Sequence, residues 1–236
     1  MDKNMKTIGI IGGLGPETAA KFQLEMLSFC LKNNKKQRPP FLLWNVPVDL
    51  KIEESVITKN GNEKAFLPLL KQAAKVLEKG GADFLVMPCN TLHIFIEDIR
   101  ESVDIPSLSI IDESVKLLKS SDIEKVGILA TSKTIDNNLF GNKLQESGIE
   151  QIILSRSDQT ILDKIIHRLI SGKKLEIDRI RINKMISKMA KRGVKNILLA
   201  CTDLQLLIKK HPKVKILDTM HILAQASANK ILKGGV

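Results

Sequence analysis

Two cysteines in this chain stand at the same kind of junction, between a buried strand and a helix. Cys89 follows the apolar run 84–87, Cys201 follows the apolar run 197–199, and a helix-like pattern comes after each cysteine. In an open α/β sheet, side chains at the carboxyl ends of the strands face a ligand crevice. A helix N-terminus next to a thiol also favours the thiolate. The chain therefore predicts two facing thiols in a duplicated α/β fold.

The pattern of strands and helices runs through the chain twice. Lys125–Thr131 repeats the apolar and glycine pattern of Thr7–Gly13. Strands that alternate with helices form mostly parallel sheets with right-handed crossovers. We therefore expect two similar Rossmann-like (flavodoxin-like) α/β domains, related by a pseudo-twofold axis. Cys89 and Cys201 would then lie on opposite walls of the cleft between the domains.

The composition is that of a globular protein that stays in solution. Of 236 residues, 43% are hydrophobic and 27% are charged, and no apolar run approaches the ~18 residues that span a bilayer. The N-terminus lacks a signal-peptide pattern, and the three cysteines show no disulfide spacing. We expect a cytoplasmic protein with reduced thiols. Cys30, at the end of a helix-like stretch, is interpreted as a small buried hydrophobe.

The formal net charge of +11 raises the question of a nucleic-acid partner. The basic residues are scattered, aromatic residues make up only 3% of the chain, and tyrosine is absent from the sequence. The sequence therefore lacks a stacking platform and a nucleic-acid-binding signature. We interpret the charge as a lysine-rich surface that attracts anionic small molecules. We expect a small-molecule partner and neither nucleic acid nor membrane.

The glycine-rich turn after the first strand does not fit a dinucleotide site. Gly13-Leu14-Gly15 is followed by Thr18 where the G-x-G-x-x-G fingerprint requires glycine. The next strand, Phe41–Asn45, ends without an acidic residue placed for a ribose. We therefore exclude an NAD-binding fold. The free N–H groups of the turn, Gly13 included, remain candidates for binding an anion.

The two cysteine segments resemble a known family. The sequences PCNTLH around Cys89 and LLACTDL around Cys201 are similar to the paired signatures of the aspartate/glutamate racemase superfamily. The opening Ile8–Glu17 resembles the aspartate racemase branch in particular. The resemblance covers most of the chain. It implies domain limits of 1–112 with 213–236, carrying Cys89, and 113–212, carrying Cys201, as well as a homodimer.

The resemblance implies an amino-acid racemase that uses no cofactor. Two cysteines on opposite faces of Cα act as base and acid, and no pyridoxal-binding lysine motif is apparent in the sequence. Because deprotonation delocalises charge into the carboxylate, fixed donors must bind that group. The candidate donors, which follow the cysteines or lie at the glycine and threonine turns, are Asn90, Thr91, Thr131, Thr202 and Gly13.

Two further polar residues accompany the cysteines. His93 either orients a neighbouring carboxylate or the thiolate, or is a satisfied histidine at a helix start. Asp203 either tunes Cys201 or caps the following helix. The Cys89–His93 spacing would suit a metal on one helix face, but further ligands are not apparent in the sequence, so we expect no metal.

The residues that select the substrate depart from the family pattern. Aspartate racemases bind the distal carboxylate with an arginine, a tyrosine and a lysine, and the aligned positions here are Ile52, His167 and Ser171. Lys51, His167 or Arg168 would have to substitute. Aspartate or a related acidic amino acid is the expected substrate. The alternatives are a cysteine-dependent dicarboxylate isomerase, a malonate decarboxylase and a catalytically silent small-molecule binding protein.

Overall fold

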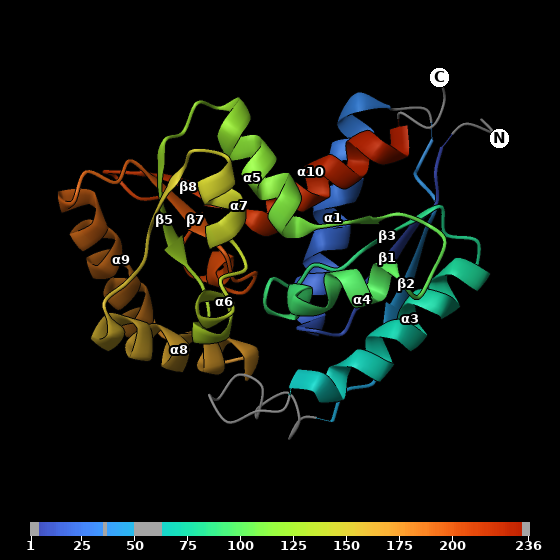
Figure 1. Cartoon of the computed structure of the whole chain (residues 1–236), viewed down its shortest axis with the longest axis horizontal. Helices are drawn as coiled ribbons and strands as arrows, with labels where there is room; N and C mark the ends of the chain where they lie inside the picture. Colours follow the sequence, from blue (N-terminus) through green and yellow to red (C-terminus); the bar gives the residue numbers. More distant parts are fainter. Residues whose placement is uncertain (1–4, 35–36, 50–62, 233–236) are drawn as a thin grey trace.

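The computed structural model describes residues 5–34, 37–49 and 63–232, which form two α/β halves (Figure 1). Each half contains a four-stranded sheet in which all neighbouring strands are parallel. The first sheet has the order β2 (Phe41–Asn45), β1 (Ile8–Gly12), β3 (Phe84–Val86), β4 (Ser107–Leu108). The second has the equivalent order β6 (Glu150–Ile152), β5 (Lys125–Leu129), β7 (Asn196–Leu199), β8 (Lys215–Asp218). The predicted fold class is confirmed.

Helices lie on both faces of the sheets, so the central strands are buried along almost their whole length. This explains why these strands are continuous apolar runs rather than alternating ones. The helices of the first half are α1 (Pro16–Asn33), η1 (Glu63–Phe66), α3 (Leu67–Lys79), η2 (Thr91–Phe95), α4 (Ile96–Arg100) and α5 (Ile110–Ser120). Those of the second half are α6 (Ser132–Asp136), α7 (Gly141–Glu146), α8 (Arg156–Ile170), α9 (Glu176–Lys191), η3 (Leu204–Leu206) and α10 (Thr219–Leu232). Among the described helices, none is long and apolar enough to cross a membrane.

The repeated glycine of the two halves has a packing reason. Gly9 pairs with Leu85 across the first sheet, and Gly127 pairs with Ile197 across the second. A Cβ on Gly9 would lie 2.7 Å from a Leu85 methyl group, and one on Gly127 would lie 2.5 Å from an Ile197 methyl group. Both positions therefore exclude a side chain, which accounts for the sequence echo between Thr7–Gly13 and Lys125–Thr131.

The predicted domain limits assign residues 213–236 to the first half, and therefore place the last strand and the last helix there together. The strand part is wrong, because β8 pairs with β7 at the edge of the second sheet. Only α10 crosses over, and it packs against α1 and α5 (Figure 1). A strand pattern does not specify which sheet the strand joins. The predicted domain limits stay a prediction, with the limit at 112/113 falling inside α5.

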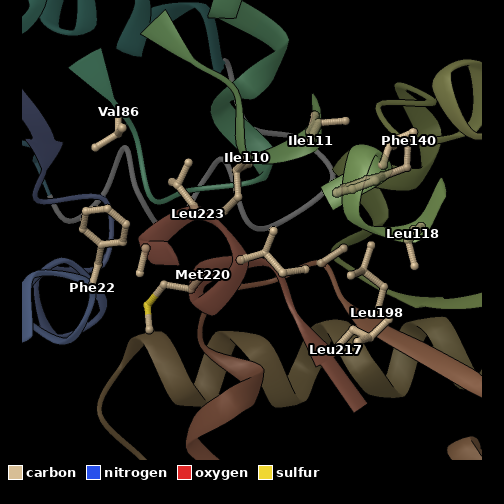
Figure 2. Packing of buried hydrophobic residues seen from close by; sticks show 14 of the residues in the cluster. Phe22, Val86, Ile110, Ile111, Leu118, Phe140, Leu198, Leu217, Met220 and Leu223 are labelled. Atoms are coloured by element: carbon tan, nitrogen blue, oxygen red, sulfur yellow. The ribbon is translucent and has the colours of Figure 1, made fainter. Parts of the chain in front are cut away.

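One hydrophobic core is shared by the two halves. Phe22 of α1 and Val86 of β3 belong to the same buried cluster as Leu198 of β7 and Leu223 of α10. Figure 2 shows Met220 and Leu223 lying between the side chains of the two halves. Each half also has a smaller core of its own. The shared core fixes the relative position of the two halves and of the strand ends that carry the cysteines.

Candidate active site

The structure places Cys89 and Cys201 on the wall of one cavity. Cys89 follows β3 and Cys201 follows β7, which occupy the same place in the two sheets. The cavity has a volume of about 60 Å³. The residues that line it are Leu14, Gly15, Phe66, Cys89, Asn90, Thr91, Leu92, Thr131, Ile170, Cys201, Thr202 and Asp203.

Cys201 is a buried thiol whose pKa is raised well above its ordinary value. Its side chain is only 7% exposed, and burial is the largest cause of the shift. The carboxylate of Asp203 adds to it, with Oδ2 lying 3.9 Å from the Cys201 sulfur, and a charged Cys89 adds further. Backbone N–H groups of Asp203 and Leu204 oppose the shift. Cys201 is therefore protonated at neutral pH.

Asp203 contacts the thiol rather than capping η3. Its carboxylate makes no capping hydrogen bond to the described backbone of that short helix. Instead Oδ1 accepts a hydrogen bond of 2.8 Å from Thr18 Oγ1 of α1. Burial raises the pKa of Asp203, and the Thr18 hydrogen bond partly offsets this. Of the two predicted roles, the geometry favours tuning of Cys201.

His93 holds the backbone of the Cys89 segment. The Ile110 N–H donates to His93 Nε2 at 3.1 Å, so Nδ1 carries the ring proton and donates to the Cys89 carbonyl at 2.6 Å. Burial lowers the pKa of His93 to about 4, which keeps the ring neutral. His93 is thus the satisfied histidine of the two alternatives. Within the described chain, no cluster of His, Cys, Asp and Glu side chains could hold a metal ion.

Hydroxyl groups from both halves meet beside the cysteines. Thr91 Oγ1 lies 3.0 Å from Thr131 Oγ1 and 3.3 Å from Thr134 Oγ1. Thr131 caps α6, since its hydroxyl accepts a hydrogen bond from the Thr134 N–H. Thr91, Thr131 and Thr202 all line the cavity. They place three hydroxyl groups on the cavity wall.

Asn90 presents an acceptor rather than a donor. Thr219 donates its hydroxyl proton to the Leu199 carbonyl, so it accepts from Asn90 Nδ2 at 3.0 Å. This fixes the orientation of the amide. Asn90 is 2% exposed, and its Oδ1 has no hydrogen-bond partner among the described residues. A buried acceptor of this kind is costly unless a donor approaches it, so Asn90 Oδ1 is a candidate contact for an N–H or O–H group of a ligand.

Two other candidates, Gly13 and His167, lie outside the lining of the cavity. Leu14 and Gly15 line it where Gly13 was expected, and the positive φ of Gly13, +84°, lets the chain pass within contact of Val46. His167 lies on α8 outside the lining. Lys51 falls outside the described residues.

Several lining and supporting residues were not predicted. Phe66 and Ile170 read as ordinary apolar helix positions, and Leu14 as part of a glycine turn. Thr18 and Thr219 act through Asp203 and Asn90, from elements distant in the sequence. No local pattern distinguishes them, because their roles arise from contacts between the two halves.

Two parallel α/β halves that each bring a cysteine to a shared cavity define a class of small-molecule enzymes with a duplicated fold. The model of the family described as Asp/Glu/Hydantoin racemase matches residues 11–227. The chain therefore belongs to this racemase family, which confirms the predicted superfamily and the predicted enzyme class, an isomerase.

Individual relatives agree over nearly the full chain. The broad specificity amino-acid racemase RacX of Bacillus subtilis (strain 168) is 24% identical over 230 residues, 95% of this chain and 98% of RacX. The aspartate racemase of Picrophilus torridus is 27% identical, with a TM-score of 0.79 and coverage of 96% of this chain and 94% of that chain. An aspartate racemase homologue from Pyrococcus horikoshii OT3 is 25% identical, with a TM-score of 0.77 and coverage of 95% of this chain and 98% of that chain.

Proposed function

We propose that this chain inverts the Cα stereocentre of an amino acid, without a cofactor, using Cys89 and Cys201 as the acid/base pair. The observation that carries the proposal is that the two thiols come from different halves and line the same small cavity. The names of the relatives, a broad specificity amino-acid racemase and an aspartate racemase, support an amino-acid substrate.

The surroundings of the cysteines suggest which one starts as the base. Cys201 is buried and protonated, so it is the acid in the resting enzyme. We assign the base to Cys89, the more exposed of the two. The Cys89 thiolate takes the Cα proton, the electron pair moves into the carboxylate, and the Cys201 S–H delivers its proton to the opposite face. In the reverse direction the roles exchange: Cys201, left as the thiolate by the forward turnover, takes the Cα proton, and the Cys89 S–H delivers its proton to the opposite face.

In this proposal, different polar groups of the cavity bind different parts of the substrate. The hydroxyls of Thr91, Thr131 and Thr202 bind the α-carboxylate and stabilise the charge that develops on it. The Asn90 acceptor takes the ammonium group, which revises the expected contact of Asn90 with the carboxylate. His93 acts as a positioning residue for the Cys89 backbone.

The alternatives receive less support from the cavity. A dicarboxylate isomerase needs a cation for the second carboxylate, and the lining formed by described residues contains none. A decarboxylase needs one cysteine as a proton donor, whereas two lie here. A silent binding protein would keep the cavity and lose turnover, so activity that depends on Cys89 excludes it.

The test is proton NMR in deuterium oxide with both enantiomers of a panel of amino acids. The wild type should lose the Cα–H signal from either enantiomer. Cys89→Ser should lose exchange with one enantiomer and Cys201→Ser with the other, because each cysteine serves one face of Cα. Each change should lower the affected rate at least ~100-fold.

Cys30→Ala is the matched control, since Cys30 is buried in the core on α1 and does not line the cavity. It should retain full exchange with both enantiomers. Equal loss of both enantiomers in Cys30→Ala, or unchanged exchange in Cys89→Ser, would contradict the mechanism.

A further inference from the structure

We infer that the substrate of this site carries an apolar side chain rather than a second carboxylate; the inference rests on the proposed function. Four large apolar side chains line the cavity, and they come from four elements: Leu14 from the turn before α1, Phe66 from η1, Leu92 from η2 and Ile170 from the end of α8. In the proposed function, the polar groups of the cysteine segments bind the α-carboxylate and the ammonium group of the substrate. The four apolar side chains are then left to contact the side chain of the substrate.

Several of the described cations near the cavity are already paired with acids. Arg168, a predicted substitute in the distal-carboxylate clamp, donates two hydrogen bonds to Asp178, at 2.8 and 2.6 Å. Asp178 is 1% exposed, so this pair is part of the protein interior. Arg168 is therefore committed to holding α8 against α9 and is not available to a ligand.

Two lysines near the cavity, Lys133 and Lys174, also lie beside acids. Lys133 follows the cavity residue Thr131, and its Nζ lies 2.9 Å from Glu63 Oε2, with both side chains mostly buried. Lys174, beyond the end of α8, lies 2.7 Å from Glu17 Oε1 near the start of α1. Both pairs join the first half to the second. A distal carboxylate would have to compete with these acids for Lys133 or Lys174.

The charge of the cavity itself is also unfavourable to a second carboxylate. Asp203 is the charged residue among the described lining residues, and it is acidic. A carboxylate buried against Leu14 or Phe66 would lose its hydration without gaining a partner. An aliphatic side chain, in contrast, gains by leaving water for the same surroundings. We therefore expect kcat/KM for leucine or methionine to exceed that for aspartate at least ~100-fold.

The experiment measures Cα–H exchange in deuterium oxide for leucine, methionine and valine beside aspartate, glutamate and lysine. Ile170→Arg adds a cation to the cavity wall. It should lower exchange with leucine and raise exchange with aspartate, each about 10-fold or more. Ile161→Arg is the matched control, because Ile161 is exposed on the same helix and lies outside the lining; it should leave both rates unchanged.

The outcomes separate the inference from the proposed function. Exchange with aspartate or glutamate but not with leucine would overturn the inference and keep the racemase. Exchange with the aliphatic amino acids that Cys89→Ser abolishes for one enantiomer supports both. If no amino acid exchanges, the proposed function fails, and calorimetric titration decides the inference: leucine binding more tightly than aspartate supports it, and the reverse overturns it.

Discussion

At the scale of single residues, Cys201 shows how the protein interior sets the protonation state of a thiol. Burial alone raises its pKa, and the Asp203 carboxylate adds to the shift. Thr18, from the other half, holds that carboxylate in place. The acid of the proposed reaction is therefore maintained jointly by the two halves of the molecule.

Replacing Asp203 with asparagine should lower the pKa of Cys201 while leaving it above the ordinary value, because the charge is removed and the burial stays. The measurement is the pH dependence of Cys201 alkylation by iodoacetamide, followed by peptide mass spectrometry. The midpoint should move to lower pH. Asp136→Asn, an exposed position on α6, is the control and should not move it. An unchanged midpoint in Asp203→Asn would show that the carboxylate does not act on the thiol.

Prediction from sequence at this scale depended on local patterns. The strand–cysteine–helix junctions identified Cys89, Cys201 and their neighbours, because that pattern is local. The acceptor role of Asn90 could not be predicted, since it depends on the direction in which Thr219 donates its proton. His93 was ambiguous for the same reason, as its tautomer is set by the Ile110 N–H across the fold.

At the scale of elements, His93 connects η2 to the first turn of α5. The ring must be neutral to accept from the Ile110 N–H, and its pKa in the folded protein is about 4, against an ordinary value of 6.5. Between these values the unfolded chain binds the proton and the folded chain does not. Stability should therefore fall as pH drops from 6.5 to 4, by up to ~3 kcal/mol from this residue.

Denaturant unfolding between pH 4 and 7.5 measures this slope. Asp218 acts in the opposite direction, because burial raises its pKa from 3.8 to about 6 and its contribution is lost as pH rises through that range. The comparison of the wild type with His93→Gln removes the Asp218 effect, since glutamine keeps a donor and an acceptor but does not titrate. In the variant, the free energy of unfolding should no longer show the fall between pH 6.5 and 4 that His93 causes. If it fails to fold, NMR titration of the wild-type ring decides, and protonation near pH 6.5 would refute the assignment.

The element scale also shows what a pattern leaves open. The strands and helices themselves were predictable from apolar runs and glycine positions. The edge strand β8 was assigned to the first half because the family resemblance and the final helix pointed there. The predicted limit between the halves, at 112/113, falls inside the partly buried helix α5.

At the scale of the whole molecule, the shared core should make the two halves unfold together. Leu223 of α10 is fully buried in that core. Leu223→Ala should lower the free energy of unfolding by about 2–5 kcal/mol. The fluorescence of Trp44, the single tryptophan, reports on the first sheet, and hydrogen exchange of the Leu198 amide reports on the second. Both probes should report the same decrease in the free energy of unfolding.

Leu24→Ala is the matched control, because Leu24 is 66% exposed on α1 and should change stability by less than about 0.5 kcal/mol. If Leu223→Ala lowered the free energy of unfolding reported by Trp44 but not that reported by the Leu198 amide, the halves would be independent. The overall class of fold was predictable, because alternation of strands and helices is periodic in the sequence. The way in which the halves join was less predictable, because an amphipathic pattern does not specify the surface against which the helix packs.

The crossing of α10 onto α1 also bears on how the protein is made. Domains generally fold in order as a chain leaves the ribosome, at about 5–20 residues per second. Here α1 is complete long before α10, which is the last described element to emerge and which covers α1. At that speed the 185 residues between α1 and α10 correspond to a delay of about 10–40 s. During this interval the apolar side of α1 is exposed on the nascent chain, which makes it the expected contact for a chaperone.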